Sequence, residues 1–489
     1  MSIQFDTIPI DLRSGGQYVE YNNSRAGQKL AGMPAKVLLI GHMTAAGTMS
    51  PLVPTRATDV KAVAGLAGPG SQLHAMFDVK ASVDRQIETW MIAAPEDGAA
   101  QAATGSCTFN AVPTNAGTFT LRIDDGRVRI AVSAGQAVDS LAAALAGAIN
   151  AAALPVTATA ALGVVTLIAR WKGESGNDID IRAGHYDEEA PPQGLDFTIV
   201  AMTGGTANPD IGPVLAAIAD DWYTDIICAF TDTANIVEME TEAIRRWSGT
   251  VMTDAQFYLG KRGTYGDLAT WGNARNSPNL VCWGAYNSPS APWKWAAALG
   301  GICAFEAKQD PARPYQTLLV PATKLLSPKR EDRFAFEARE QLLRDGISTF
   351  AVDDDGAVRV ADIFTMYQRN AYGYEDSSYR KLETVKTLSF MRYSMRARIA
   401  QRFPRHKLAS DATKLRHGEF KIRPTEIRNE LIALAGDWED AGLAENLEQF
   451  KDELQVERDM NDPDRVNAII VPDVVNQFRI FAARIDFVN

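Results

Sequence analysis

Cysteine and histidine side chains are the first candidates for catalytic or metal-binding chemistry, and their spacing argues against both. Three of the four cysteines lie within apolar runs, and no C-x-x-C pair occurs. Such surroundings are typical of small buried hydrophobes. The five histidines form no H-x-x-x-H pair and no zinc set with a cysteine. We therefore predict inert core thiols and no metal site; the cysteines are Cys107, Cys228, Cys282 and Cys303.

Two turns could bind ions, but each has a simpler explanation. The Gly-Pro-Gly-Ser turn at 68–71 could hold a phosphate at a helix N-terminus, yet it lacks the Lys and Ser/Thr pair of a P-loop. Ser71 is sufficient as a helix N-cap. The triple aspartate at 353–355 could bind a divalent cation, but Asp-Gly between two alternating runs indicates a hairpin turn. The common nucleotide, hydrolase and zinc-protease motifs are missing, so we predict no catalytic residue and no cofactor.

A basic block near residue 400 could bind nucleic acid through phosphates. It has few of the interleaved aromatic residues expected of a single-strand binder. Residues 375–430 carry 14 Lys/Arg against 7 Asp/Glu, and residues 431–465 carry 3 against 11. Complementary contact between subunits is therefore the favoured interpretation. The candidate basic contact face consists of Arg396, Arg402, Arg405 and Lys407.

Composition limits the class of protein. The chain has 489 residues, 46% of them hydrophobic, and this length indicates about three globular domains. Its net charge is -11. That charge argues against a protein whose whole surface binds nucleic acid or anionic lipid. No run of about 18 apolar residues and no secretory signal is visible, so we expect no membrane insertion and a cytosolic protein when it is made.

The pattern along the chain predicts a discontinuous α/β core. Short apolar runs separated by capped helices indicate a partly parallel sheet over 26–95 and again over 206–365. Between them, 96–205 reads as an inserted, mostly β domain with 12 acidic and 6 basic residues and a hairpin over 119–132. The overall expectation is a mixed α+β chain, with a C-terminal α+β assembly domain at 366–489.

Both ends of the chain read as strands without a neighbour. An N-terminal extended arm at 1–25 carries alternating apolar residues, and so does the C-terminal run. A terminal strand must pair with something. The residues are Ile8, Ile10 and Leu12 at the start, and Phe481, Ala483, Ile485 and Phe487 at the end.

The stretch 441–458 predicts an amphipathic helix, with apolar residues toward a core and charged residues outward. An ordinary surface helix is one interpretation, and a helix that docks a partner protein is the other. The outward candidates are Glu445, Glu448, Lys451 and Asp452.

These features together resemble the contractile tail sheath proteins of Mu-like bacteriophages. The resemblance covers the arm, the core and the last 140 residues, and its motifs occur in the family's order. They lie at 68–73 (GPGSQL), 346–360 (GISTFAVDDDGAVRV), 367–373 (YQRNAYG), 387–392 (TLSFMR), 402–408 (RFPRHKL), 427–430 (IRNE), 456–458 (VER) and 471–479 (VPDVVNQFR).

The resemblance implies a structural function without a catalytic residue. In this family many copies form a helical sleeve of stacked rings around an inner tail tube, and the sleeve contracts to drive the tube through the host envelope. Terminal strands of one subunit join a small sheet in its neighbours. Implied partners are the tube, baseplate and tail terminator proteins, with assembly in the host cytoplasm and a final place in the virion. The 441–458 helix is the candidate tube-facing element.

Two alternatives stay open at this point. A soluble α/β enzyme would carry its site at the carboxyl ends of the core strands. The sheath of a phage-tail-like bacteriocin or of another contractile injection system would have much the same sequence, and neighbouring genes for capsid and terminase would separate it from a phage.

Overall fold

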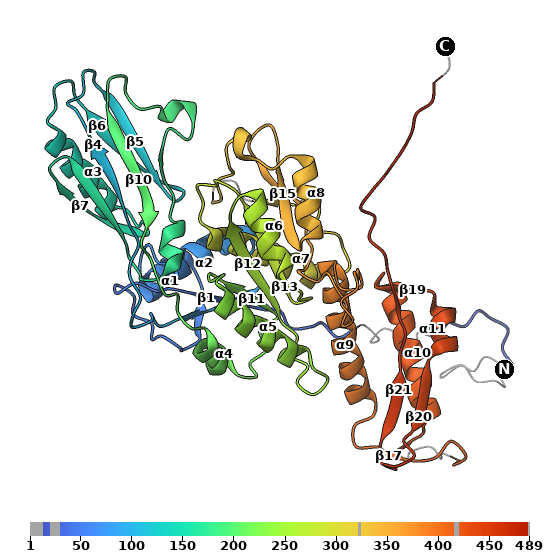
Figure 1. Cartoon of the computed structure of the whole chain (residues 1–489). Coiled ribbons are helices and arrows are strands. Elements are labelled where there is room, and N and C mark those ends of the chain that lie inside the picture. The colour runs from blue at the N-terminus through green and yellow to red at the C-terminus, as the bar shows by residue number, and fades with distance from the viewer. Residues whose placement is uncertain (1–12, 20–29, 321–323, 415–419, 488–489) are drawn as a thin grey trace. The chain divides into compact units, whose positions relative to one another are not determined.

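The computed structural model describes residues 13–19, 30–320, 324–414 and 420–487 (Figure 1). Within these ranges the chain divides into two compact units. The core unit combines 34–389 with 476–489, and the C-terminal unit combines 390–475 with 1–33. Both contain helices and strands, so the predicted mixed α+β class is confirmed, whereas the predicted domain boundaries stay predictions.

A nine-stranded sheet forms the centre of the core unit. Its order is β14-β16-β15-β13-β12-β11-β1-β3-β2, and the six strands from β15 to β3 in that order run parallel. Because β1 pairs with both β3 and β11, the chain segments on either side of 96–205 share one sheet. The strands are β1 (Lys36–Gly41), β2 (Thr55–Ala57), β3 (Glu88–Ala93), β11 (Asp225–Cys228), β12 (Gln256–Arg262), β13 (Leu280–Ala285), β14 (Leu319–Val320), β15 (Ile347–Val352) and β16 (Val358–Asp362).

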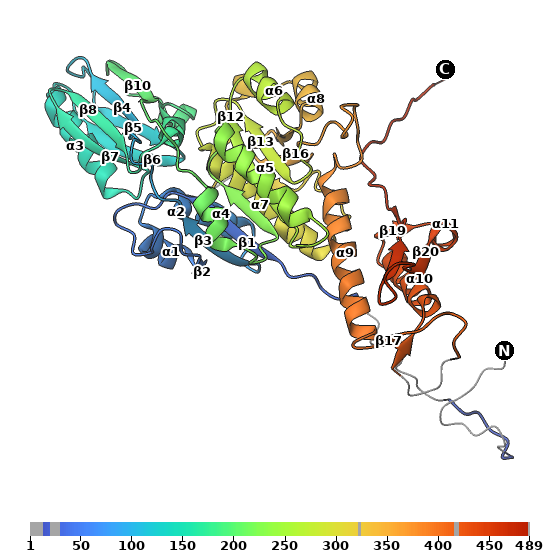
Figure 2. The ribbon, with the colours of Figure 1, turned by 60° about the horizontal axis from the view of Figure 1, so that its bottom comes forward.

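Helices cover both faces of this sheet (Figure 2). Along β1, Val37 and Leu39 join a core cluster with α2 and α7, whereas Leu38 and Ile40 join a second cluster with α4 and α5. A strand buried on both faces reads as a continuous apolar run, as residues 37–41 (VLLIG) do. The helices are α1 (Val60–Ala67), α2 (Gln72–Val83), α4 (Gly212–Ile218), α5 (Thr233–Trp247), α6 (Tyr265–Asn273), α7 (Pro292–Gln309) and α8 (Phe336–Arg344).

Both turns weighed for ion binding have the structures that the simpler interpretation predicted. The Ser71 hydroxyl accepts a hydrogen bond from the backbone N–H of His74 at 3.1 Å and caps α2. The triple aspartate closes the β15–β16 hairpin, where Asp353 pairs with Arg359 at 2.5 Å and Gly356 adopts φ +84°.

Segment 96–205 forms two antiparallel sheets around helix α3 (Val138–Ala151), which buries Leu141, Leu145 and Ile149. The predicted hairpin forms with Phe119 opposite Ile130. One sheet has the order β10-β4-β8-β7 and the other β6-β5-β9. Their strands are β4 (Thr104–Phe109), β5 (Gly117–Ile123), β6 (Gly126–Val132), β7 (Val156–Ala161), β8 (Val164–Ala169), β9 (Ile181–Ala183) and β10 (Phe197–Thr203).

The C-terminal unit is built on helix α10 (Pro424–Asp440) and the second half of α9 (Leu382–Arg402). Trp438 of α10 is buried and donates a hydrogen bond to Ser394 of α9 at 3.0 Å. Three two-stranded sheets complete the unit: β17 (Lys407–Leu408) with β18 (Lys421–Ile422), β19 (Ala444–Glu445) with β22 (Asp473–Val474), and β20 (Gln455–Arg458) with β21 (Val466–Ile469).

The prediction of one helix over 441–458 was wrong. Only α11 (Leu447–Glu453) is helical, because the residues on both sides pair as strands. Gly442 and Asn446 adopt the left-handed conformation at φ +69° and +60° and interrupt the helical path. The apolar positions are still buried, since Leu443, Phe450 and Leu454 are at most 4% exposed. Helical spacing in the sequence thus identified buried apolar residues correctly but predicted the wrong secondary structure for them.

Candidate assembly site

The thiols are unsuited to nucleophilic chemistry. All four cysteines are buried, and burial raises the pKa of Cys107, Cys228 and Cys282 to about 12. Across the described ranges no three His, Cys, Asp or Glu side chains gather where they could hold a metal ion. The described helices also include none that is long and apolar enough to cross a bilayer.

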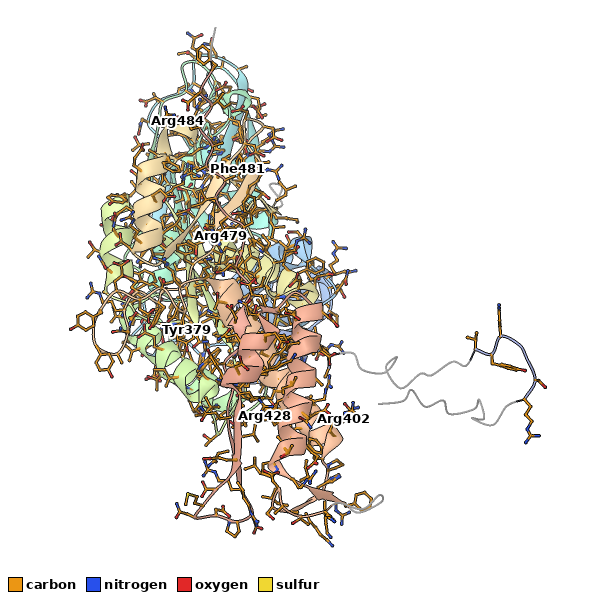
Figure 3. All side chains as sticks on the ribbon, turned by 90° about the vertical axis from the view of Figure 1, so that its right-hand side faces the viewer. Tyr379, Arg402, Arg428, Arg479, Phe481 and Arg484 are labelled. Atoms are coloured by element: carbon orange, nitrogen blue, oxygen red, sulfur yellow. The ribbon has the colours of Figure 1, made fainter. Side chains whose placement is uncertain are left out.

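The C-terminal segment after Arg479 is the most exposed apolar stretch in the described chain. Phe481, Ile485 and Phe487 are 80%, 87% and 81% exposed, and Ala483 is exposed as well. The segment pairs with no described strand. Arg479, Phe481 and Arg484 of this part of the chain are labelled in Figure 3. An unpaired strand with an apolar face is a template for addition to another sheet. The N-terminal candidates Ile8, Ile10 and Leu12 lie outside the described residues.

Arg479 fixes the start of this segment to the core unit. Its guanidinium lies 2.7 Å from Glu383 in the first turn of α9 and also pairs with Asp362 at the end of β16. It stacks over the ring of Phe364 with the centroid 5.3 Å away. Because the Arg479 side chain is 10% exposed and that of Glu383 is fully buried, the pair is shielded from water. The contacts of Arg479 therefore anchor the segment, and we call this set of residues the clasp.

Burial and pairing act in opposite directions on the charges of the clasp. Burial raises the pKa of Glu383 to about 7 and lowers the pKa of Arg479 to about 10. The 2.7 Å contact opposes both shifts, because each charge stabilises the other. Separation of the two side chains would leave both buried groups without this compensation.

The clasp was missed as a site by sequence analysis. Arg479 was noticed only inside the 471–479 motif, and nothing in its neighbourhood indicated Glu383 or Asp362 as partners. Its position two residues before the exposed Phe481 was the one available signal.

The predicted basic contact face lies at the end of α9 and the start of β17, and all four of its residues are exposed. Part of its charge is neutralised inside the subunit: Arg402 pairs with Glu430 at 3.1 Å. The buried Arg398 beside it pairs with Glu430 at 2.9 Å and with Asp437. The basic and acidic blocks at 375–430 and 431–465 thus form ion pairs within one chain. The sequence had suggested that these two blocks contact each other between subunits. Arg405 and Lys407 form no ion pair with another described residue.

The predicted tube-facing residues lie on two elements instead of one helix. Glu445 belongs to β19, and Glu448, Lys451 and Asp452 belong to α11. Lys451 is half-buried and pairs with Glu448 at 2.5 Å, while the other three are exposed. Behind them, β20 and β21 pair only with each other among the described strands. Each therefore offers an open edge to which a further strand can add.

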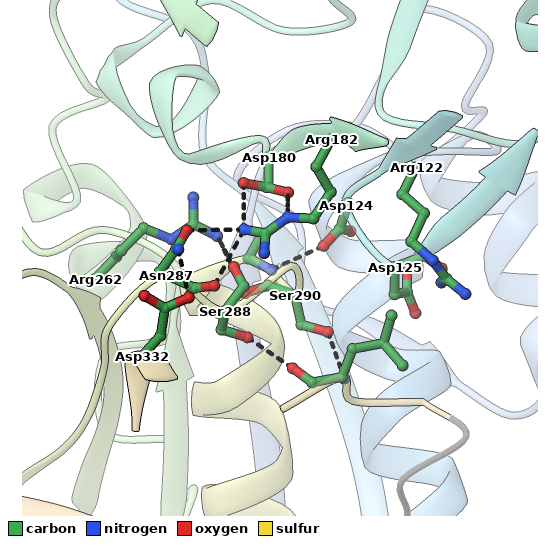
Figure 4. A network of polar contacts seen from close by, with 12 residues as sticks. Arg122, Asp124, Asp125, Asp180, Arg182, Arg262, Asn287, Ser288, Ser290 and Asp332 are labelled. Carbon is green, nitrogen blue, oxygen red and sulfur yellow. Dashed lines mark hydrogen bonds and ion pairs between the residues drawn. The ribbon is translucent and has the colours of Figure 1, made fainter. Parts of the chain in front are cut away.

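A buried polar network joins segment 96–205 to the main sheet (Figure 4). The ammonium group of Lys294 at the start of α7 lies 2.5 Å from Asp124 and also pairs with Asp125, in the turn between β5 and β6. The backbone N–H of Ala291 donates to Asp124 at 2.8 Å. Arg262 of β12 donates to the carbonyl oxygen of Asp178 at 2.7 Å.

Charge pairing maintains this network. Burial disfavours the charge of Lys294, but Asp124 and Asp125 hold its pKa above the usual range. Burial raises the pKa of Asp124 to about 6 despite Lys294. The insertion is thus held to the core by ion pairs as well as by apolar packing.

Open sheet edges and an anchored, exposed apolar segment are typical of a structural protein of the self-assembling kind. Comparison with known proteins gives the family. Residues 204–366 match the phage tail sheath protein central domain, and residues 374–488 match the phage tail sheath C-terminal domain. The chain therefore belongs to the phage tail sheath family, and the resemblance noted in the sequence is confirmed.

Two relatives extend this result. The chain is 38% identical over 492 residues to the Mu-like prophage FluMu tail sheath protein of Haemophilus influenzae, with 100% of both chains covered. The crystal structure of a sheath tail protein from Listeria innocua shares the fold, with 13% identity, a TM-score of 0.50, and 92% of this chain and 94% of that chain covered. The protein is a structural tail sheath protein, and the alternative of an α/β enzyme is wrong.

Proposed function

We propose that copies of this chain polymerise as a helical sleeve around an inner tail tube, and that contraction of the sleeve drives the tube through the host envelope. The exposed, anchored segment at 480–487 carries the proposal. Its main-chain donors and acceptors and its apolar face have no partner strand in the described chain, so a neighbouring subunit would supply one.

The open edges of β20 and β21 are the receiving surface that we propose for this strand. Each subunit would donate its segment 480–487 to one neighbour and accept the same segment of another neighbour at β20 or β21. Because donor and acceptor are different surfaces of the chain, the contact is head-to-tail. Such contacts need not close and then produce open helical filaments. Strand addition also keeps subunits linked while their core units change contacts during contraction.

The proposed partners follow from this architecture. They are further copies of the chain, the inner tube protein, and the baseplate and tail terminator proteins at the two ends of the sleeve. We place the protein in the host cytoplasm during assembly and in the virion afterwards. Glu445, Glu448 and Asp452 stay the candidates for contact with the tube.

The alternating faces of the C-terminal segment allow a matched test. Phe481→Ser with Ile485→Ser removes the apolar face, whereas Arg484→Ser with Asp486→Ser changes the opposite, ion-paired face. On overexpression we expect long tubes in negative-stain micrographs for the wild type and the second variant. We expect soluble, folded subunits for the first variant. Deletion of residues 1–20 should likewise leave a folded subunit that forms no tubes.

Circular dichroism and size-exclusion chromatography of each variant confirm folding. Tubes of normal length from the Phe481/Ile485 variant would contradict the role of this strand. The absence of tubes from the wild type under all assembly conditions would contradict the proposed function itself.

A further inference from the structure

A groove of about 640 Å³ lies beside the clasp in the core unit. It is lined by α8, the β15–β16 strands, residues 380–381 and the first residues of the C-terminal segment. Its volume is in the range of about 300–1,000 Å³ that is typical of small-molecule pockets. The groove is therefore large enough to take the tip of a loop.

Cations outnumber anions on the groove wall. Five cationic side chains line it, against the two carboxylates of Glu340 and Asp362, and Asp362 is already paired with Arg479. Arg344, at the exposed end of α8, makes no side-chain hydrogen bond or ion pair with another described residue. The guanidinium of Arg380 lies over the ring of Phe364, 5.7 Å from its centroid, and forms no hydrogen bond or ion pair with another described residue. The wall thus has positive charge available for an acidic ligand.

Two buried polar atoms on the wall lack partners. The hydroxyl of Thr349, a residue that is 1% exposed, and Nε of Arg339 have no hydrogen-bond partner in the described chain. A buried donor without an acceptor costs about 1–3 kcal/mol. An acceptor supplied by a docked ligand would satisfy these two donors.

The groove also presents apolar surface at its rim. Phe336 is 64% exposed, Phe478 73% and Ile480 83%. A matching ligand therefore combines carboxylates with an apolar side chain.

The chain carries a loop of this composition at the tip of the β20–β21 hairpin. Met460 is 97% exposed, and Asp462 and Asp464 follow it on the same exposed turn. The turn is held in shape because Asp459 accepts hydrogen bonds from the backbone N–H groups of Asn461 and Asp462, at 2.8 and 3.0 Å. A preorganised loop loses little conformational entropy when it binds.

We propose that the 459–465 hairpin tip of a second copy of this chain docks into the groove. Met460 packs against the apolar rim, and Asp462 and Asp464 pair with Arg344 and Arg380. This inference rests on the proposed sleeve and adds a second contact to it, separate from strand addition. Tip and groove are different surfaces of one chain, so this contact also propagates head-to-tail.

Disulfide trapping tests the contact directly. All four native cysteines are buried, so a cysteine introduced at the surface is the reactive one in the described chain. Chains with Met460→Cys are mixed with chains carrying Arg344→Cys, assembled and oxidised mildly. We expect a disulfide-linked dimer on a non-reducing gel. The matched control replaces Arg344→Cys by Lys172→Cys, an exposed site on segment 96–205, and should give no dimer.

The outcomes separate the two proposals. Tubes that form normally but give no dimer above the control would overturn the docking contact and leave the sleeve intact. If no tubes form, even from wild-type chains, the proposed function fails. A chain carrying both cysteines that yields only a faster-migrating monomer would show that the tip docks in its own groove, and would also overturn the proposal.

A charge swap provides a second test that general misfolding cannot imitate. Arg344→Glu with Arg380→Glu should reduce the polymerised fraction by more than about tenfold, because like charges then face each other. Adding Asp462→Lys with Asp464→Lys in the same chain should restore polymerisation. Failure of this rescue in a folded, soluble chain would contradict the pairing.

Discussion

Nη2 of Arg479 lies 2.7 Å from Oε1 of Glu383, although 96 residues separate them in the chain. The intervening residues include all of 390–475, the larger part of the C-terminal unit. The chain leaves the core unit through α9 shortly after Glu383 and re-enters it shortly before Arg479. The clasp therefore links a residue that lies shortly before the chain leaves the core unit to one that lies shortly after its return, and it fixes the point at which the C-terminal segment begins.

Arg479→Ala should destabilise the core unit and release the C-terminal segment. Removal of one partner from a buried pair leaves an uncompensated charge and costs about 3–5 kcal/mol. Denaturation in guanidinium chloride of the monomeric Phe481/Ile485 variant, with and without Arg479→Ala, measures the decrease in the free energy of unfolding. Arg484→Ala is the control, because among the described residues that exposed arginine pairs only with exposed Asp486, and the substitution should change stability by less than about 1 kcal/mol. Equal effects of the two substitutions would contradict the clasp.

The stability of the Arg479→Ala variant should also fall as the pH rises. With Arg479 in place, burial raises the pKa of Glu383 to about 7, above its ordinary value of 4.5, and removal of the cation should raise this pKa further. A group whose pKa is raised on folding stabilises the folded chain below its unfolded pKa, and this contribution is lost as the pH rises through the folded pKa. Because Glu383 of the variant keeps its proton to higher pH than Glu383 of the parent, the variant should lose additional stability above about pH 7, by up to about 1.4 kcal/mol per pH unit relative to the parent. The double variant with Glu383→Gln should show no such difference, and a pH-independent gap in the single variant would contradict the assignment.

Lys294→Met should loosen segment 96–205 from the core. Methionine preserves most of the volume but leaves Asp124 and Asp125 without their shared cation, at a cost of about 3–5 kcal/mol. Hydrogen exchange of β5 and β6 should accelerate, while exchange in β12 and β13 changes little. Lys172→Met, at an exposed position, is the matched control. Unchanged protection of the β5–β6 hairpin would show that apolar packing alone holds the insertion.

Local patterns determined a large part of this protein. The two-residue period of 119–132 and the Asp-Gly turns predicted both hairpins correctly, because cross-strand pairs and turn residues are close neighbours in sequence. The short apolar runs of β1 and β11, separated by capped helices, predicted a partly parallel sheet, and the two strands pair in parallel. The same alternation marked Phe481, Ile485 and Phe487 as a strand without an internal neighbour.

The tertiary structure alone decided which distant charges meet. Glu383 with Arg479, Lys294 with Asp124, and Arg398 with Asp437 are pairs whose members lie 39 or more residues apart, and no local pattern encodes them. It also decided the backbone of 441–458, where strand pairing at both ends of α11 prevailed over helical spacing. Periodicity reports which side of an element is buried, whereas ion pairing and strand pairing depend on what the rest of the chain brings alongside.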